Sequence, residues 1–277
     1  MKVILFLCLL VLLLSQLVIA RNVQTGFFAE LVERFPRLME LPEDPYFPDR
    51  YCLAHGVGCS PNAEVRSFII HNIDLDGELP YSINRLYLAE KIVISGCLIS
   101  ADLEAFSSMR SLKYLNLSNN KITGQIPVFN QQLLVLDLSG NNLSTLPPAF
   151  PFTLTQLKLQ NNRLEGTLKR YEKVNFSNLT HFILSNNMLT GELPSCFGSF
   201  KKLQEFRDWL VLVKFINLSI ANSIHTIQSD ISNNNFSGEF PGTVLWLPVI
   251  RIMYEIISLA SRHGFLRANS PNSELSM

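Results

Sequence analysis

Apolar residues recur along this chain at an interval of about 23 residues, and each cluster is followed by a short polar turn. The two clearest copies cover residues 115–127 and 182–194, which read LNLSNNKITGQIP and FILSNNMLTGELP. Self-similarity at a fixed period is the signature of a solenoid, in which short repeats stack along one axis. Such a stack presents a long solvent-facing surface rather than a closed catalytic pocket. The repeat therefore predicts a recognition scaffold.

Each repeat has one short segment that alternates apolar and other residues. Its second apolar residue marks the repeat, and the six markers are Ile70, Ile94, Leu117, Leu138, Leu159 and Leu184, separated by 24, 23, 21, 21 and 25 residues. The apolar residue two positions before each marker is Phe68, Ile92, Leu115, Leu136, Leu157 and Phe182. This alternation is typical of a β-strand with one buried face.

Polar and small residues also hold fixed places in the repeat. Three residues after the marker stands an asparagine in four repeats, namely Asn120, Asn141, Asn162 and Asn187. We expect these amides to satisfy backbone groups that stacking would leave buried and unpaired. Cys97 takes this place in the second repeat, where we expect a free buried thiol. Glycines share a later position, where they predict a tight bend: Gly77, Gly124, Gly166 and Gly191.

The N-terminus predicts export. Lys2 precedes an apolar run over residues 4–14, and small residues follow at 18–20. This pattern indicates a secretory signal peptide over residues 1–20, because the run is shorter than the roughly 20 residues that span a bilayer. An N-terminal membrane anchor is the alternative. Residues 21–64 would then form an N-terminal cap in an oxidising compartment, with Cys52 and Cys59 as a disulfide pair.

The composition and motifs argue against several functions. Lysine and arginine together number 23, as do aspartate and glutamate, so no basic field would attract nucleic acid. The sequence contains no metalloprotease, serine hydrolase, P-loop or kinase signature. We therefore expect no enzyme activity, no cofactor and no metal site.

Six Asn-x-Ser/Thr sequons are candidate glycosylation sites in a secreted chain. They begin at Asn116, Asn142, Asn175, Asn178, Asn217 and Asn235. Asn175 and Asn178 lie outside the strand positions and are the strongest candidates.

The pattern weakens toward the C-terminus. We expect about eight repeats over residues 65–242, of which the seventh is degenerate because Asp208 falls at its marker. Residues 207–228 reflect either ordinary divergence of a repeat or sequence that is not natural coding sequence. A good copy resumes at Ile231. Residues 243–277 form a tail whose apolar part, 243–260, predicts either a membrane span or a capping helix.

The repeats of residues 52–203 resemble the plant-type extracellular leucine-rich repeat, and the segment CLAHGVGC over residues 52–59 resembles that family's N-terminal cap, although Leu53 stands near the place of its usual tryptophan. The resemblance implies an α/β-type solenoid, a right-handed superhelix. Its concave side would be a parallel β-sheet of short strands, and its convex side mostly irregular or 3-10 structure. It also implies membership among receptor-like proteins, receptor-kinase ectodomains or secreted inhibitors of cell-wall-degrading enzymes.

Residues that flank the buried strand positions must face the concave side, where they are free to serve a ligand. The candidates are Lys91, Val93, Tyr114, Asn116, Val135, Asp137, Gln156, Lys158, His181 and Ile183. Their mixed chemistry suits a peptide or protein.

Three functions remain open. The first is the extracellular recognition module of a receptor-like protein at the cell surface, which signals through a partner receptor kinase and is anchored through residues 243–260. The second is a secreted inhibitor of a cell-wall-degrading enzyme such as polygalacturonase, in the extracellular space or cell wall. The third is a non-functional receptor fragment.

Overall fold

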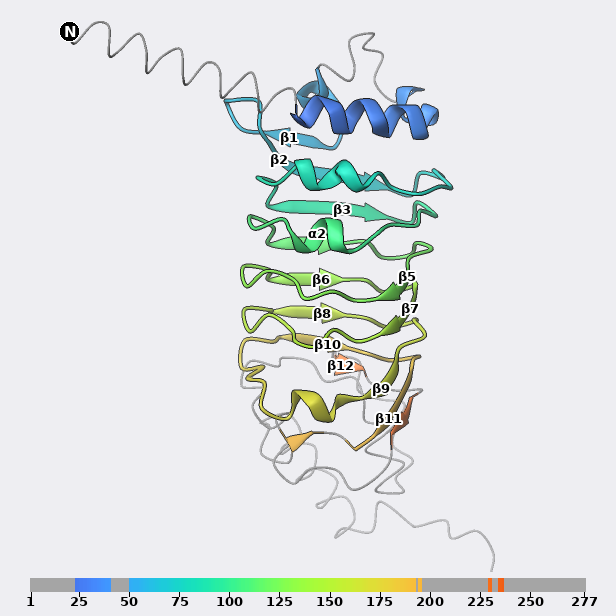
Figure 1. The fold of residues 1–277 in the computed structure, drawn as a ribbon, viewed down its shortest axis with the longest axis vertical. Coiled ribbons are helices and arrows are strands. Elements are labelled where there is room, and N and C mark those ends of the chain that lie inside the picture. Colours follow the sequence, from blue (N-terminus) through green and yellow to red (C-terminus); the bar gives the residue numbers. More distant parts are fainter. Residues whose placement is uncertain (1–22, 41–49, 193, 196–228, 231–233, 237–277) are drawn as a thin grey trace, which may run out of the picture.

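The structure is a computed structural model of the 277-residue chain and describes residues 23–40, 50–192, 194–195, 229–230 and 234–236. Several expectations lie outside these residues: the signal peptide (1–20), the degenerate repeat around Asp208, the sequon at Asn217 and the tail (243–277). The described residues form a single elongated stack of coils, one coil for each repeat (Figure 1).

One sheet runs the length of the stack, and all of its strands after the first are parallel. The parallel strands are β2 (Val65–His71), β3 (Lys91–Ser95), β4 (Tyr114–Asn116), β6 (Val135–Asp137), β8 (Gln156–Lys158), β10 (His181–Ile183) and β12 (Ser229–Asp230). All six predicted markers and their partners two residues earlier are buried, which confirms the predicted strand pattern. Burying such side chains contributes about 1.5–3 kcal/mol each, and only neighbouring coils can bury them.

A second parallel sheet lies along one side of the stack, and the sequence analysis missed it. It consists of β5 (Thr123–Gln125), β7 (Asn142–Thr145), β9 (Glu165–Thr167), β11 (Met188–Gly191) and β13 (Asn235–Phe236). Gly124 and Gly166 lie at the centres of β5 and β9. The glycine position thus belongs to a strand with positive φ rather than to a simple bend. Gly77 differs, since it has no positive φ and a Cβ there would lie 2.9 Å from the ring of Phe35.

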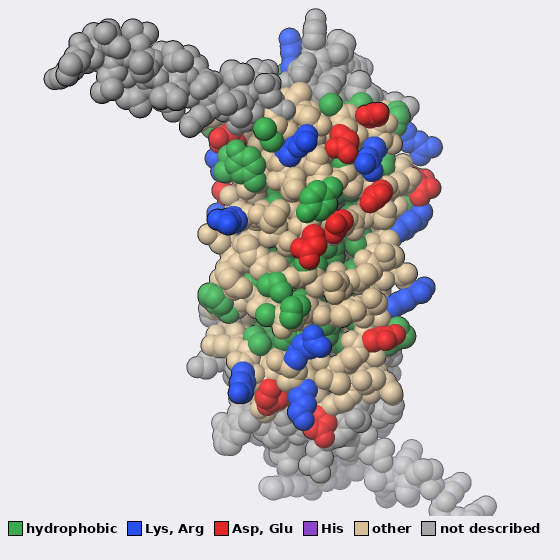
Figure 2. Space-filling view, in the orientation of Figure 1, with side chains coloured by type: hydrophobic (Ala, Val, Ile, Leu, Met, Phe, Trp, Pro, Cys, Tyr) green, Lys and Arg blue, Asp and Glu red, His purple; other side chains and the backbone are tan. Residues whose placement is uncertain are grey.

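The side opposite the first sheet carries short helical turns, as predicted. They are η3 (Tyr81–Arg85), α2 (Glu104–Ser107) and η4 (Leu168–Tyr171). In the view that has these turns in front, acidic and basic side chains are interspersed with small apolar patches (Figure 2).

A cap of helices closes the N-terminal end of the stack. A helix over residues 23–34 is followed by η1 (Pro36–Glu40), η2 (Tyr51–Leu53) and β1 (Val57–Cys59), and β1 pairs antiparallel with β2. Phe28 stacks on Tyr51 at 4.6 Å between ring centroids. The Cys52–Cys59 disulfide is present, as predicted. The cap covers the edge of β2 that would otherwise offer unpaired backbone groups.

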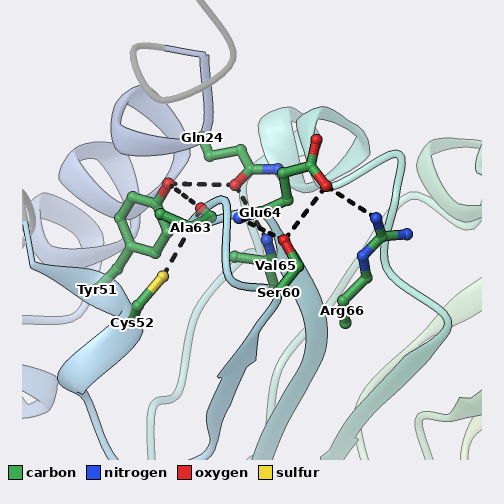
Figure 3. Close-up of polar contacts among 8 residues, drawn as sticks. All are labelled: Gln24, Tyr51, Cys52, Ser60, Ala63, Glu64, Val65 and Arg66. Carbon is green, nitrogen blue, oxygen red and sulfur yellow. Dashed lines mark hydrogen bonds and ion pairs between the residues drawn. The ribbon is translucent and has the colours of Figure 1, made fainter. Parts of the chain in front are cut away.

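A buried glutamine links the cap to the first coil (Figure 3). The side-chain oxygen of Gln24 accepts hydrogen bonds from the Tyr51 hydroxyl and from the backbone N–H of Val65, each at 3.2 Å. The Tyr51 hydroxyl also lies 3.0 Å from the carbonyl oxygen of Ala63. A single side chain thus joins the helix over residues 23–34, η2 and the first strand of the stack.

The predicted asparagine ladder is confirmed. In Asn162, for example, Nδ2 donates to the carbonyl oxygens of Leu138 and Leu159 at 3.0 Å, and Oδ1 accepts from the N–H of Leu143 at 3.0 Å. Asn120, Asn141 and Asn187 make the corresponding bonds. Cys97 is free and buried, as expected, and burial raises the pKa of its thiol. Its sulfur lies 3.9 Å from the carbonyl oxygen of Ile70, a weak counterpart of the asparagine bond.

The residue before each ladder position has a left-handed backbone conformation in the six coils of residues 65–192. These residues are Asn72, Gly96, Asn119, Gly140, Asn161 and Asn186, with φ between 53° and 66°. Asparagine and glycine are the residue types that adopt this conformation most readily. The sequence carried this signal, but the sequence analysis did not use it.

Ser229–Asp230 and Asn234 extend the stack. Strand β12 pairs directly with β10, and β13 pairs directly with β11. Asn234 also occupies the ladder, because its Nδ2 donates to the carbonyl oxygen of Leu184 at 2.9 Å. Residues 229–230 and 234–236 therefore lie next to the coil of Leu184, since β12 and β13 pair directly with its strands.

Candidate ligand-binding face

The exposed side of the first sheet holds two columns of side chains in register. The first column is Ser67, Lys91, Tyr114, Val135, Gln156 and His181, and the second is Ile69, Val93, Asn116, Asp137, Lys158 and Ile183. All ten predicted site residues belong to these columns. We call the two columns together the sheet face. The structure thus places every predicted residue in one of two adjacent columns of the same sheet.

Lys91 and Tyr114 interact within the first column. The Lys91 ammonium lies 5.0 Å from the centroid of the Tyr114 ring, within the range of a cation–π contact. Among the described residues, no carboxylate forms an ion pair with Lys91. This pair therefore offers a ligand an exposed positive charge beside an aromatic ring.

The second column contains a partly buried polar centre. The Asp137 carboxylate lies 4.0 Å from Lys158 Nζ and accepts hydrogen bonds from the N–H and hydroxyl of Ser139. Asp137 is only 9% exposed and Val93 only 3%, so these two residues offer little surface to a ligand. Asn116, between them, is half-buried, and its Oδ1 accepts from the N–H of Ser118.

A border row that the sequence analysis did not select lies one residue before the first column. Lys113 donates to Glu90 at 2.7 Å, and this hydrogen bond, together with the positive charge, lowers the pKa of Glu90. Leu134, next in the row, is 40% exposed. The row could have been found from the sequence, because it keeps the same spacing as the columns.

Neither a metal centre nor a membrane-spanning helix was found where the structure is described. No group of three or more His, Cys, Asp or Glu residues in that part of the chain is arranged to hold a metal ion. No helix among the described residues is both long enough and apolar enough to cross a membrane.

Together, the stacked coils, the asparagine ladder and the second sheet define a leucine-rich repeat protein. The family described as Leucine Rich Repeat matches residues 111–133, 132–152 and 178–200. The chain thus carries leucine-rich repeats and is similar to the plant receptor-like proteins, in agreement with the resemblance drawn from the sequence.

Among curated proteins, Receptor-like protein EIX2 of Solanum lycopersicum is 32% identical over 95 residues, covering 33% of this chain and 9% of that protein. Receptor-like protein 35 of Arabidopsis thaliana is 32% identical over 185 residues, covering 62% of this chain and 15% of that protein. The matched part of the chain thus spans only a small share of the length of these relatives.

Among solved structures, the Arabidopsis receptor kinase HAESA, in complex with the peptide hormone IDA and the co-receptor SERK1, is 29% identical. The match covers 62% of this chain and 30% of that chain, with a TM-score of 0.45.

Proposed function

We propose that this chain is an extracellular recognition module of a receptor-like protein, and that it binds a peptide or protein on the sheet face. The observation that carries the proposal is the pair of columns in register. Folding requires the buried positions of each strand, whereas most of the column residues contact solvent and are free to differ between coils. Lys91, Tyr114, Gln156 and His181 provide charge, an aromatic ring and an amide on one rigid surface.

The proposal includes a route to signalling. In this proposal the protein acts at the cell surface through a partner receptor kinase. The similarity to proteins named receptor-like proteins supports this role.

Site-specific cross-linking tests the proposal. A photo-reactive amino acid is placed at Gln156 on the sheet face, with a matched control at exposed Lys169 in η4 on the opposite side. The full chain, secreted by a eukaryotic host, is illuminated with the peptide and protein fraction of plant extracellular fluid. We expect adducts at position 156 but not at 169, and we expect Lys91→Glu to reduce them at least fivefold. Equal adducts at both positions would contradict the proposal.

The inhibitor alternative has its own readout. The secreted chain is mixed with polygalacturonase, and the release of sugar ends is measured. Inhibition that is relieved by Lys91→Glu but not by Lys169→Glu would favour a secreted inhibitor over a receptor module. A chain that folds, cross-links nothing and inhibits nothing would support the non-functional fragment.

A further inference from the structure

The sequons differ in what their asparagine side chains do in the folded stack. Five of the six begin at a residue that the structure describes, and Asn217 lies outside. An N-linked sugar is bulky and is attached to Nδ2 of asparagine, so a modified site must leave Nδ2 unengaged and leave room for the sugar in the folded coil.

Asn175 has an available amide. It is exposed, in the segment between η4 and β10, and its Oδ1 accepts a hydrogen bond from the N–H of Ser177 at 3.0 Å. No hydrogen bond from its Nδ2 appears among the described residues. A sugar at this nitrogen would extend from a connecting segment rather than from either sheet.

Asn178, three residues later, uses the same atom to hold two coils together. It is half-buried, and its Nδ2 donates to the carbonyl oxygen of Phe152 at 3.2 Å. One coil earlier, the hydroxyl of Thr153 makes the corresponding bond to the carbonyl oxygen of Gln131 at 2.9 Å. Thr153 and Asn178 both directly precede the first apolar residue of their repeats, Leu154 and Leu179. The Asn178 side chain is therefore part of a repeated tie between coils.

Asn116 lies in the middle of the sheet face. It pairs in register with Val93 on one side and Asp137 on the other, both of which are buried. Neighbouring strands are only about 4.8 Å apart, so a sugar on Asn116 would have to lie over both neighbours.

We propose that Asn175 carries an N-linked oligosaccharide, whereas Asn178 and Asn116 remain unmodified. The donor would be an oligosaccharide on a lipid pyrophosphate. Nδ2 of Asn175 forms a bond to C1 of the first sugar, the bond from C1 to the pyrophosphate oxygen breaks, and the amide gives up one proton as the lipid pyrophosphate leaves. The proposal does not depend on what the sheet face binds.

Peptide mapping of the secreted full chain tests this assignment. Trypsin is expected to release residues 174–201, which contain both neighbouring sequons, and residues 114–121, which contain Asn116. Enzymatic removal of the sugars in ¹⁸O-water converts each modified asparagine to a labelled aspartate, and fragment ions then locate the label. We expect the label at Asn175 in most molecules, with unlabelled Asn178 and Asn116.

Two variants make the test decisive. Ser177→Ala destroys the sequon of Asn175 but keeps the backbone N–H that Asn175 accepts from, and it should remove one sugar chain. Asn178→Gln should leave that sugar chain in place. The proposal is overturned if the wild-type label lies at Asn178 or Asn116, if neither position of the 174–201 peptide is labelled, or if Ser177→Ala leaves the sugar chain intact.

Discussion

At the scale of single residues, the stack depends on polar side chains that lie between apolar ones. Each ladder asparagine joins backbone groups of its own coil and the preceding coil, which water cannot reach. Unpaired buried groups of this kind cost about 1–3 kcal/mol each. The coils are therefore held in register by amides as much as by leucines.

Asn162→Ala tests the ladder. The substitution leaves the buried N–H of Leu143 without its acceptor, whereas the carbonyl oxygens of Leu138 and Leu159 lose one of two donors and keep Asn141 and Asn187. We expect the free energy of unfolding to fall by about 1–3 kcal/mol, measured by urea denaturation. Lys169→Ala, at an exposed position in η4, is the control and should change stability much less. Similar losses in the two variants would contradict the role given to the ladder.

Gly140→Ala tests the left-handed column. Gly140 has φ of 65°, and a Cβ there would approach Oδ1 of Asn119 to 2.3 Å. Gly124 has φ of 86° but no atom within 4 Å of such a Cβ. Gly124→Ala should therefore show only the backbone cost of about 1–2 kcal/mol, and Gly140→Ala a larger loss. Thermal unfolding of both variants provides the comparison, and equal losses would exclude the contact with Asn119 as a cause.

At the scale of strands and turns, coils are also joined by ion pairs on their outer surface. Glu90 and Lys113 belong to successive coils, and Asp76 and Lys121 to coils two apart. In each pair the hydrogen bond and charge of the lysine lower the pKa of the carboxyl group below its ordinary value. These exposed pairs add little stability individually, but they make it depend on pH.

The expected pH dependence has a definite sign. The pKa of Glu90 is lower in the folded state than in the unfolded state, where it is near 4.5. The pair thus stabilises the fold above the unfolded pKa, and this contribution is lost as pH falls through the folded pKa. We expect the urea midpoint to fall between pH 6 and pH 3, and less so in Glu90→Gln. Lys113→Met should weaken the pH dependence as much as Glu90→Gln does. The double variant should weaken it no further, because each substitution removes the same interaction. If the urea midpoint of Glu90→Gln fell with pH as steeply as that of the wild type, the stabilising role given to the Glu90–Lys113 pair would be contradicted.

The strands also show where the sequence was sufficient. The first sheet was predictable because its strands alternate buried and exposed side chains. The second sheet was not, since β5 and β9 expose all three of their residues and leave no alternation to detect. The sheet face was predictable as a surface, but the burial of Val93 and Asp137 was not, because it depends on side chains of neighbouring coils. Gly77 lies at a bend, as predicted, but its close contact with Phe35 of the cap was not predictable for a similar reason.

At the scale of the whole molecule, each coil contacts mainly its neighbours, so stability is expected to vary along the stack. The N-terminal end relies on the cap, in which Phe27, Phe28 and Tyr51 are buried against the first coil. The middle coils have a neighbour on both sides. Local opening should therefore begin at an end rather than at the centre.

Removing the cap disulfide tests this expectation. Replacement of Cys52 and Cys59 by alanine should cost roughly 2 kcal/mol, because the bond closes a short loop. In hydrogen exchange, we expect protection to fall first in β1 and β2, while β6 and β8 keep theirs. Cys97→Ala, which removes a thiol but no disulfide, should not produce this gradient. A uniform loss of protection along all the strands would show that the stack unfolds as one unit.

The parallel pairing of the first sheet also fixes a distance scale for anything lying along the stack. Successive strands are about 4.8 Å apart, so every second strand repeats after about 9.6 Å. A polyproline II peptide returns to the same side every three residues, after about 9.3 Å. Such a peptide, running across the strands, would bring every third side chain to every second coil, for instance first to Lys91 and then to Val135. Every third residue of such a ligand would then contact the sheet face.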